Sequence, residues 1–112
     1  MWDALRGGFG KKLLSNTDTI ASSNTSQILK KGSEANTFAR PVRLLLVLHA
    51  SQDAYIAKTS AEVDLDEDGG NDCRIFIPAD VAPFAIPWTG QDVYFLNAVD
   101  TETPMMSVVG IP

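Results

Sequence analysis

From Pro41 to the C-terminus, the chain is a series of short segments rich in β-branched and aromatic residues, and this pattern limits the fold most. The first segment, residues 42–48, is apolar except for Arg43. Turn-forming residues separate it from the later segments at residues 54–57, 74–77, 92–96 and 105–109. Strands spaced in this way are typical of small all-β domains. We therefore predict an all-β fold: a small antiparallel β-sandwich or a jelly-roll-like barrel.

The first forty residues have a different composition. Residues 15–39 are dominated by Ser, Thr, Asn, Gln, Gly and Lys, with isolated apolar positions only. We predict an extended N-terminal arm over residues 1–40 that a partner orders, with one edge strand near residues 26–30. The β-sandwich domain is predicted to occupy residues 41–112.

The start of the arm contains a candidate partner-binding stripe. Trp2, Leu5, Phe9 and Leu13 are spaced by three, four and four residues, which is the period of one helical face. Gly7, Gly8 and Gly10 oppose a helix, at up to about 1 kcal/mol each. We expect a short element that forms only against a partner.

The segment at residues 42–48 is apolar on both faces, which predicts a central strand covered on both sides. Leu44, Leu46 and Leu48 share one face, and Leu45 and Val47 share the other. We expect the first set in the core and Leu45 at a contact with a partner, although the two sets could be exchanged.

Size and charge favour association. A chain of 112 residues is one small domain with a marginal core. Residues 1–60 carry eight Lys or Arg against four Asp or Glu, whereas residues 61–112 carry one against ten. The opposite charges of the two halves favour head-to-tail attraction between copies. Alternatively, the basic arm folds over the acidic domain of its own chain. Nucleic acid is an unlikely partner because the β-rich half is acidic, and no apolar stretch is long enough for a membrane span.

An acidic stretch at residues 64–72 is the strongest metal motif. Asp64, Asp66 and Asp68, followed by Gly69, match the first half of a calcium loop. The twelfth position is Ile75, where such a loop needs Glu. We therefore expect a solvated loop and no required cofactor, with a weak calcium site as the alternative.

Catalytic candidates are few. His49 is the only histidine, and Ser51 follows it by two residues, but no oxyanion-type Gly motif accompanies them. A structural His49 is the simpler interpretation, and a small hydrolase or isomerase of cupin-like shape is a distant alternative. Trp88, Tyr94 and Tyr55 could instead form a stacking platform for carbohydrate or another surface ligand.

Several motifs together resemble small β-sandwich virion proteins of bacteriophages. They are Ser26-Gln27-Ile28-Leu29, Arg43-x-Leu45-x-Val47, Asp53-Ala54-Tyr55-Ile56 and Val93-Tyr94-Phe95. The resemblance implies a capsid decoration, head-fibre or spike-base subunit that works by surface fit and has no catalytic residues. We therefore expect a non-enzymatic structural protein located in the virion. Its expected partners are copies of itself and other virion or scaffold proteins. A carbohydrate- or surface-ligand-binding module is the alternative.

Overall fold

The computed structural model describes residues 14–64, 74–80 and 83–112. The elements are β1 (Leu14–Thr19), β2 (Gln27–Ile28), β3 (Val42–Ala50), β4 (Ala54–Ala57), α2 (Ser60–Val63), β5 (Ile75–Ile77), β6 (Phe84–Gly90), β7 (Tyr94–Asn97) and β8 (Met105–Ile111). No helix in these ranges is long and apolar enough to cross a membrane.

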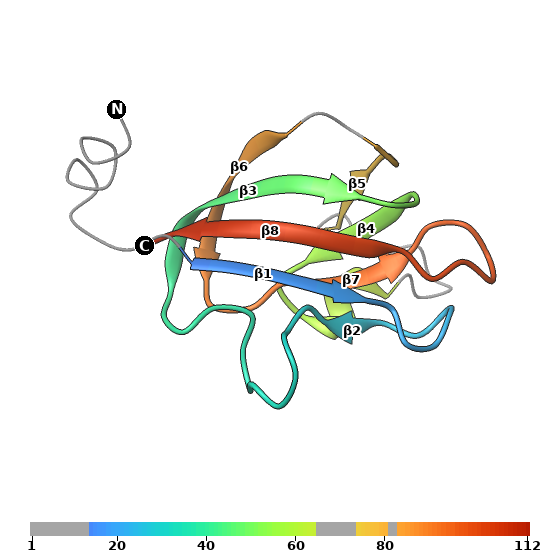
Figure 1. Cartoon of the computed structure of the whole chain (residues 1–112), viewed down its shortest axis with the longest axis horizontal. Helices are drawn as coiled ribbons and strands as arrows, with labels where there is room; N and C mark the ends of the chain where they lie inside the picture. Colours follow the sequence, from blue (N-terminus) through green and yellow to red (C-terminus); the bar gives the residue numbers. More distant parts are fainter. Residues whose placement is uncertain (1–13, 65–73, 81–82) are drawn as a thin grey trace.

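The strands form two antiparallel sheets that pack face to face (Figure 1). The strand orders are β1-β8-β3-β6 in the first sheet and β2-β7-β4-β5 in the second. Strand β1 pairs with β8, β2 with β7, β3 with β6 and β4 with β5. The first strand thus pairs with the eighth, the second with the seventh, the third with the sixth and the fourth with the fifth. These pairs are divided between two sheets, which is the topology of a double-sheet jelly roll. The predicted all-β sandwich is confirmed. The sheets stay open and do not close into a barrel.

The core lies between the two sheets and takes residues from both. Its largest fully buried side chains include Phe38, Phe95, Ile20, Leu29, Leu45, Ile56, Ile77 and Met106. Alternate residues point inward along most strands, as the two-residue period of a strand requires, and irregularities in the register interrupt this alternation in β3. In β8, for example, Met106 and Val108 are buried while Ser107 and Val109 are half-buried on the other face.

The predicted boundary between residues 40 and 41 is wrong for residues 14–40. Strand β1 pairs with β8 over six residues, and β2 pairs with β7. Ile20, Leu29 and Phe38 are 2%, 0% and 1% exposed within the core. The sandwich therefore includes this segment, and the edge strand expected near residues 26–30 is confirmed as β2. Residues 1–13 lie outside the described residues.

Polar side chains on its inward face explain why β1 is hard to recognise from sequence. Asn16 is 3% exposed, and its Nδ2 donates to the Thr37 carbonyl at 2.9 Å. Asp18 Oδ2 accepts from the Lys30 N–H at 3.1 Å and from Gln27 Nε2 at 2.9 Å. The inward side chains of β1 thus form hydrogen bonds with residues of the 27–37 segment. In a typical strand of a sandwich, the side chains at these positions are apolar and pack in the core.

The predicted orientation of β3 is reversed. Leu45 and Val47 are fully buried between the sheets, whereas Leu44 and Leu46 are half-buried and Leu48 is 40% exposed. The prediction that Leu45 contacts a partner was therefore wrong. Leu45 lies between Gly110 of β8 and Ile86 of β6, which are its Cα partners in the two neighbouring strands. The alternative in which the two sets exchange faces is the one that the structure adopts.

Two connecting segments differ from what their sequences indicate. The prolines at positions 78, 83 and 87 are typical of an irregular connection over residues 79–87, yet residues 84–90 form β6 at the sheet edge. Phe84 and Ile86 of this strand pack against the core. The alternation of polar and apolar residues at positions 62–65 is typical of a strand, yet Glu62 and Val63 belong to the single helical turn α2. Thr59 caps this turn: its Oγ1 accepts from the Glu62 N–H at 3.1 Å and lies 3.0 Å from Glu62 Oε1. Thr59-Ser60-Ala61-Glu62 matches the sequence pattern of a capping box, although here Glu62 accepts from the Thr59 hydroxyl.

Candidate functional site

The solvent-facing side of the β1-β8-β3-β6 sheet, called the outer face here, is mainly apolar. Leu44, Leu46 and Leu48 of β3 lie at its centre, beside Val109 of β8. On the β6 side, Leu46 is opposite Ala85 and Leu44 is opposite Pro87, both of which are exposed. Paired residues of neighbouring strands face the same side, so these side chains form one continuous apolar surface.

None of the outward positions of these four strands is acidic, although the protein carries a net charge of −5. The outward positions of β1 and β8 add Ser15, Thr17, Thr19, Met105 and Ser107. The charged or titratable side chains that the structure describes lie at the borders of this surface. Arg43 and His49 lie toward the two ends of β3, and Lys58 Nζ donates to Thr89 Oγ1 of β6 at 2.7 Å. Glu62 lines a small pocket with Lys58 and Pro87 at the same edge. Another copy can therefore approach this side without the repulsion that acidic surfaces would produce.

The two edges of this sheet are poorly suited to adding another strand. In β1, the N–H groups of Thr17 and Thr19 donate to the preceding side chains, Asn16 Oδ1 at 2.9 Å and Asp18 Oδ1 at 2.8 Å. Gln27 Nε2 donates to the Thr19 carbonyl at 3.0 Å. In β6, Pro87 has no N–H to offer. Contact through the outer face is therefore favoured over edge-to-edge pairing.

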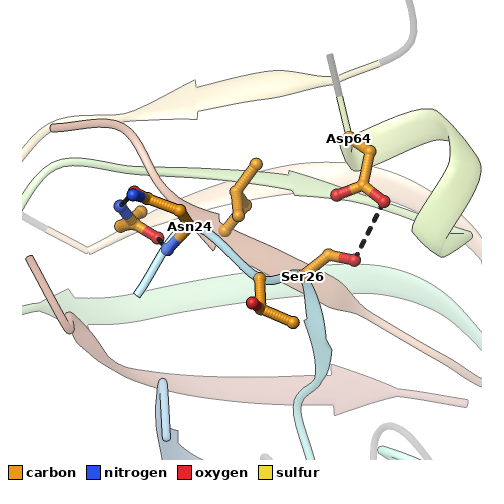
Figure 2. A pocket seen from close by; sticks show the side chains of 6 residues that line it. Asn24, Ser26 and Asp64 are labelled. Atoms are coloured by element: carbon orange, nitrogen blue, oxygen red, sulfur yellow. Dashed lines mark hydrogen bonds between the residues drawn. The ribbon is translucent and has the colours of Figure 1, made fainter. Parts of the chain in front are cut away.

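A polar pocket lies between the loop that precedes β2, the C-terminal end of α2 and the end of β7. It has a volume of about 430 Å³. Figure 2 shows Ser26 and Asp64 pointing toward each other from opposite walls, with Asn24 farther along. The lining residues are Asn24, Thr25, Ser26, Asp64, Leu96 and Asn97.

Hydrogen bonds hold the pocket walls in place. The Asn24 N–H donates to Asn97 Oδ1 at 2.7 Å, and Asn97 Nδ2 donates to Asn24 Oδ1 at 2.8 Å. Asn97 is only 6% exposed, so β7 anchors the loop from inside. Ser26 Oγ donates to Asp64 Oδ2 at 3.2 Å and links the loop to the end of α2. Asn24 has a φ of 63°, a left-handed conformation that Asn tolerates better than most residues.

Of the predicted metal ligands, the structure places only Asp64. Its carboxylate lines the polar pocket and accepts from Ser26. Asp66 and Asp68 lie outside the described residues. Within the described part of the chain, no three His, Cys, Asp or Glu side chains come together as a metal site would require. The weak calcium site therefore remains a prediction.

The three predicted platform residues do not share one surface: Trp88 belongs to β6 of the first sheet, whereas Tyr55 and Tyr94 are half-buried in β4 and β7 of the second. Trp88 is 3% exposed within β6, and its Nε1 donates to the Asp92 carbonyl at 3.2 Å, so it cannot stack on a ligand in solution. Tyr55 lies on the outward side of the second sheet. Its ring contacts the Arg74 guanidinium at 3.6 Å and the edge of Phe76 at 5.6 Å between ring centroids. Phe76 is 47% exposed. The sequence analysis did not identify it as a candidate binding residue, because its segment indicates a strand but not which side chains face solvent.

His49 and Ser51 do not form a catalytic pair within the described residues. His49 lies opposite Ser107 in β8, next to an irregularity in the register of β3. The Ser51 hydroxyl accepts from the Met105 N–H at 2.8 Å, and the Ser51 N–H donates to the Met105 carbonyl at 2.9 Å. Ser51 thus joins the end of β3 to the start of β8.

The remaining predicted partner-binding residues are outside the described part of the chain: Trp2, Leu5, Phe9 and Leu13. The apolar residues that the structure does place outward, Leu44 and Leu46, were predicted to be core. Asn24 and Asn97 gave no sequence signal, because isolated asparagines are common in turns and their pairing depends on a contact 73 residues apart.

Comparisons with known proteins leave the family open. No family model matches the chain, and neither the curated proteins nor the solved structures give a significant match.

Proposed function

We propose that this chain is a non-enzymatic structural protein that assembles with copies of itself through the outer face of the β1-β8-β3-β6 sheet. The observation that carries the proposal is the apolar surface centred on Leu44, Leu46 and Val109, which has no acidic side chain at its outward positions. Apolar patches of this kind commonly mark interaction sites. Because the centre of the surface is apolar and its outward strand positions carry no acidic side chain, a second copy can present the same surface to it in a two-fold arrangement.

The area of the outer face is small, as expected for a weak contact that recurs many times in an assembly of many copies. Seven residues of β8 extend over about 23 Å, and four strands span about 19 Å, which gives roughly 450 Å² a copy. Two copies would bury roughly 900 Å², less than the roughly 1,200 Å² at the lower end of stable pairs. Multivalent assembly makes such weak contacts effective.

We further propose that the assembly is a bacteriophage virion, in which the chain is a capsid decoration, fibre or spike-base subunit. Support comes from the motif resemblance and from the jelly-roll pairing of the eight strands. Double-sheet jelly rolls occur in viral capsid domains, and also in lectins and cupins, so this step is an analogy of fold. Residues 1–13, with Trp2, Leu5, Phe9 and Leu13, remain the proposed docking segment toward another virion or scaffold protein.

Sedimentation equilibrium over a range of concentrations tests self-assembly. Leu46→Lys places a charge at the centre of the outer face, and Phe76→Lys makes the same charge change on the other sheet, where Phe76 is already 47% exposed. We expect wild type and Phe76→Lys to associate and Leu46→Lys to stay monomeric. A wild-type protein that remains monomeric throughout, or equal weakening by both variants, would contradict the proposal.

A further inference from the structure

The polar pocket is a cavity that the proposed assembly leaves unused. Its volume of about 430 Å³ lies within the range of small-molecule sites. It belongs to the loops at the end of β7, away from the outer face of the other sheet. The reciprocal bonds between Asn24 and Asn97 fix its wall, so a ligand would meet groups that are already oriented.

The described lining residues favour some ligand classes over others. None of them is Lys or Arg, which disfavours phosphate and other anions. Asp64 is the one carboxylate among them, and the described residues bring no three potential metal ligands together. All of them except Leu96 are polar, which disfavours an apolar ligand.

Neutral, hydroxyl-rich molecules fit what remains. Amide and hydroxyl groups both donate and accept, as a sugar hydroxyl does, and a carboxylate accepts from several hydroxyls. The Asn24 amide has two N–H groups, of which one donates to Asp100. The Thr25 side chain is exposed and has no hydrogen-bond partner among the described residues. Leu96 supplies an apolar surface for the C–H face of a sugar ring.

An aromatic row extends from the pocket across the second sheet. Leu96 is the Cα partner of Tyr55, and Tyr55 is the partner of Phe76. Partnered residues face the same side of a sheet, so the row leads from the pocket wall to the exposed Phe76 ring. The Arg74 guanidinium lies over the Tyr55 ring at 3.6 Å, so Phe76 presents the exposed ring of this row. A second sugar unit would contact this row after the first occupies the pocket.

We propose that the polar pocket binds a neutral carbohydrate, and that the Tyr55–Phe76 row binds an adjoining sugar unit. This site is independent of Trp88, which is buried, and of self-assembly through the outer face. The polar groups would hold the first sugar by hydrogen bonds, and the aromatic row would add contact area with the second.

The test is binding of the full-length protein to an array of neutral oligosaccharides, followed by calorimetric titration of the best hit and of its constituent monosaccharide. We expect the oligosaccharide to bind more tightly than the monosaccharide. Asp64→Asn and Thr25→Val should each weaken binding of both by about tenfold, the effect of losing one hydrogen bond to a ligand. Phe76→Ala should weaken binding of the oligosaccharide only.

Ser107→Ala, on the outer face of the other sheet, is the matched control and should bind as wild type does. Thermal unfolding of each variant confirms that it is folded. No binding by any neutral member of the array overturns the proposal, as does equal binding of inorganic phosphate or unchanged affinity in both Asp64→Asn and Thr25→Val. None of these outcomes depends on the oligomeric state, which sedimentation measures separately.

Discussion

Leu45 and Leu46 are neighbours in β3, yet they face opposite sides of the sheet. Leu45 is 0% exposed between the two sheets, and Leu46 is half-buried on the outer face. The two residues have the same side chain, so they separate the effect of the core from the effect of the surface.

We predict that Leu45→Ala lowers the free energy of unfolding by about 2–5 kcal/mol, because it leaves a cavity in the core. Leu46→Ala should lower it by about 1 kcal/mol or less, since much of that side chain already contacts water. Urea denaturation of both monomeric variants measures the difference. Equal losses would mean that the outer face is covered within a single chain.

Gly110 is a second position where a single atom matters. A Cβ at this residue would lie 2.5 Å from Val42 Cγ1 and 3.0 Å from the Phe38 ring. We predict that Gly110→Ala destabilises the fold by about 1–3 kcal/mol through overpacking. Ser107→Ala in the same strand, on the outer face, is the control and should change stability little. A Gly110→Ala variant as stable as wild type would show that Phe38 and Val42 can move aside.

At the scale of elements, hydrogen bonds of polar side chains stabilise β1, whereas a strand with apolar inward residues is stabilised by packing in the core. Asn16 is the clearest case, with a buried amide that donates to Thr37 and accepts from Thr17. We predict that Asn16→Ala costs about 1–3 kcal/mol, because the Thr37 carbonyl loses its donor inside the fold. Asn36→Ala removes an amide whose bond to Asp92 is only partly buried, and should cost less. Chemical denaturation compares the two variants.

The same contacts explain what could be predicted from sequence. Strands β3, β4, β5, β7 and β8 were predictable, because their segments alternate polar and apolar residues or are rich in β-branched and aromatic residues. Strand β1 was missed because Asn16 and Asp18 occupy inward positions that pattern analysis assigns to solvent. The orientation of β3 could not be chosen, since both faces are apolar and only the partner strands decide which one is buried. The polar pocket depends on Asn24 and Asn97 meeting across 73 residues, which no local pattern encodes.

At the scale of the whole molecule, residues 14–40 belong to the sandwich. We predict that removing residues 1–19, which deletes β1, abolishes cooperative thermal unfolding, because β8 loses its neighbour over six residues. Removing residues 1–13 keeps every described strand and should preserve the cooperative transition. Circular dichroism melting curves of the two truncated proteins distinguish them. A cooperative transition without β1 would restore the interpretation of this segment as a separable arm.

Metal removal should have little effect on the whole molecule. Ile75 stands where a calcium loop needs Glu, and the described residues contain no group of three potential ligands. We predict the same melting temperature with and without chelator. A rise of several degrees on adding millimolar calcium would instead show that the 64–72 segment, with Asp64, Asp66 and Asp68, binds the ion in the folded state.

The position of β8 has a consequence for the order of folding. Strand β8 follows the other described strands in the sequence and lies between β1 and β3 (Figure 1). Thr17 and Ser107, which are 90 residues apart, therefore form a hydrogen bond between β1 and β8. During synthesis, β1 and β3 therefore have no neighbour on their facing edges until β8 has emerged. Such non-local closure is slow, and unpaired edges can pair with other chains meanwhile. A chain truncated before Met105 would have a gap between β1 and β3 in its first sheet.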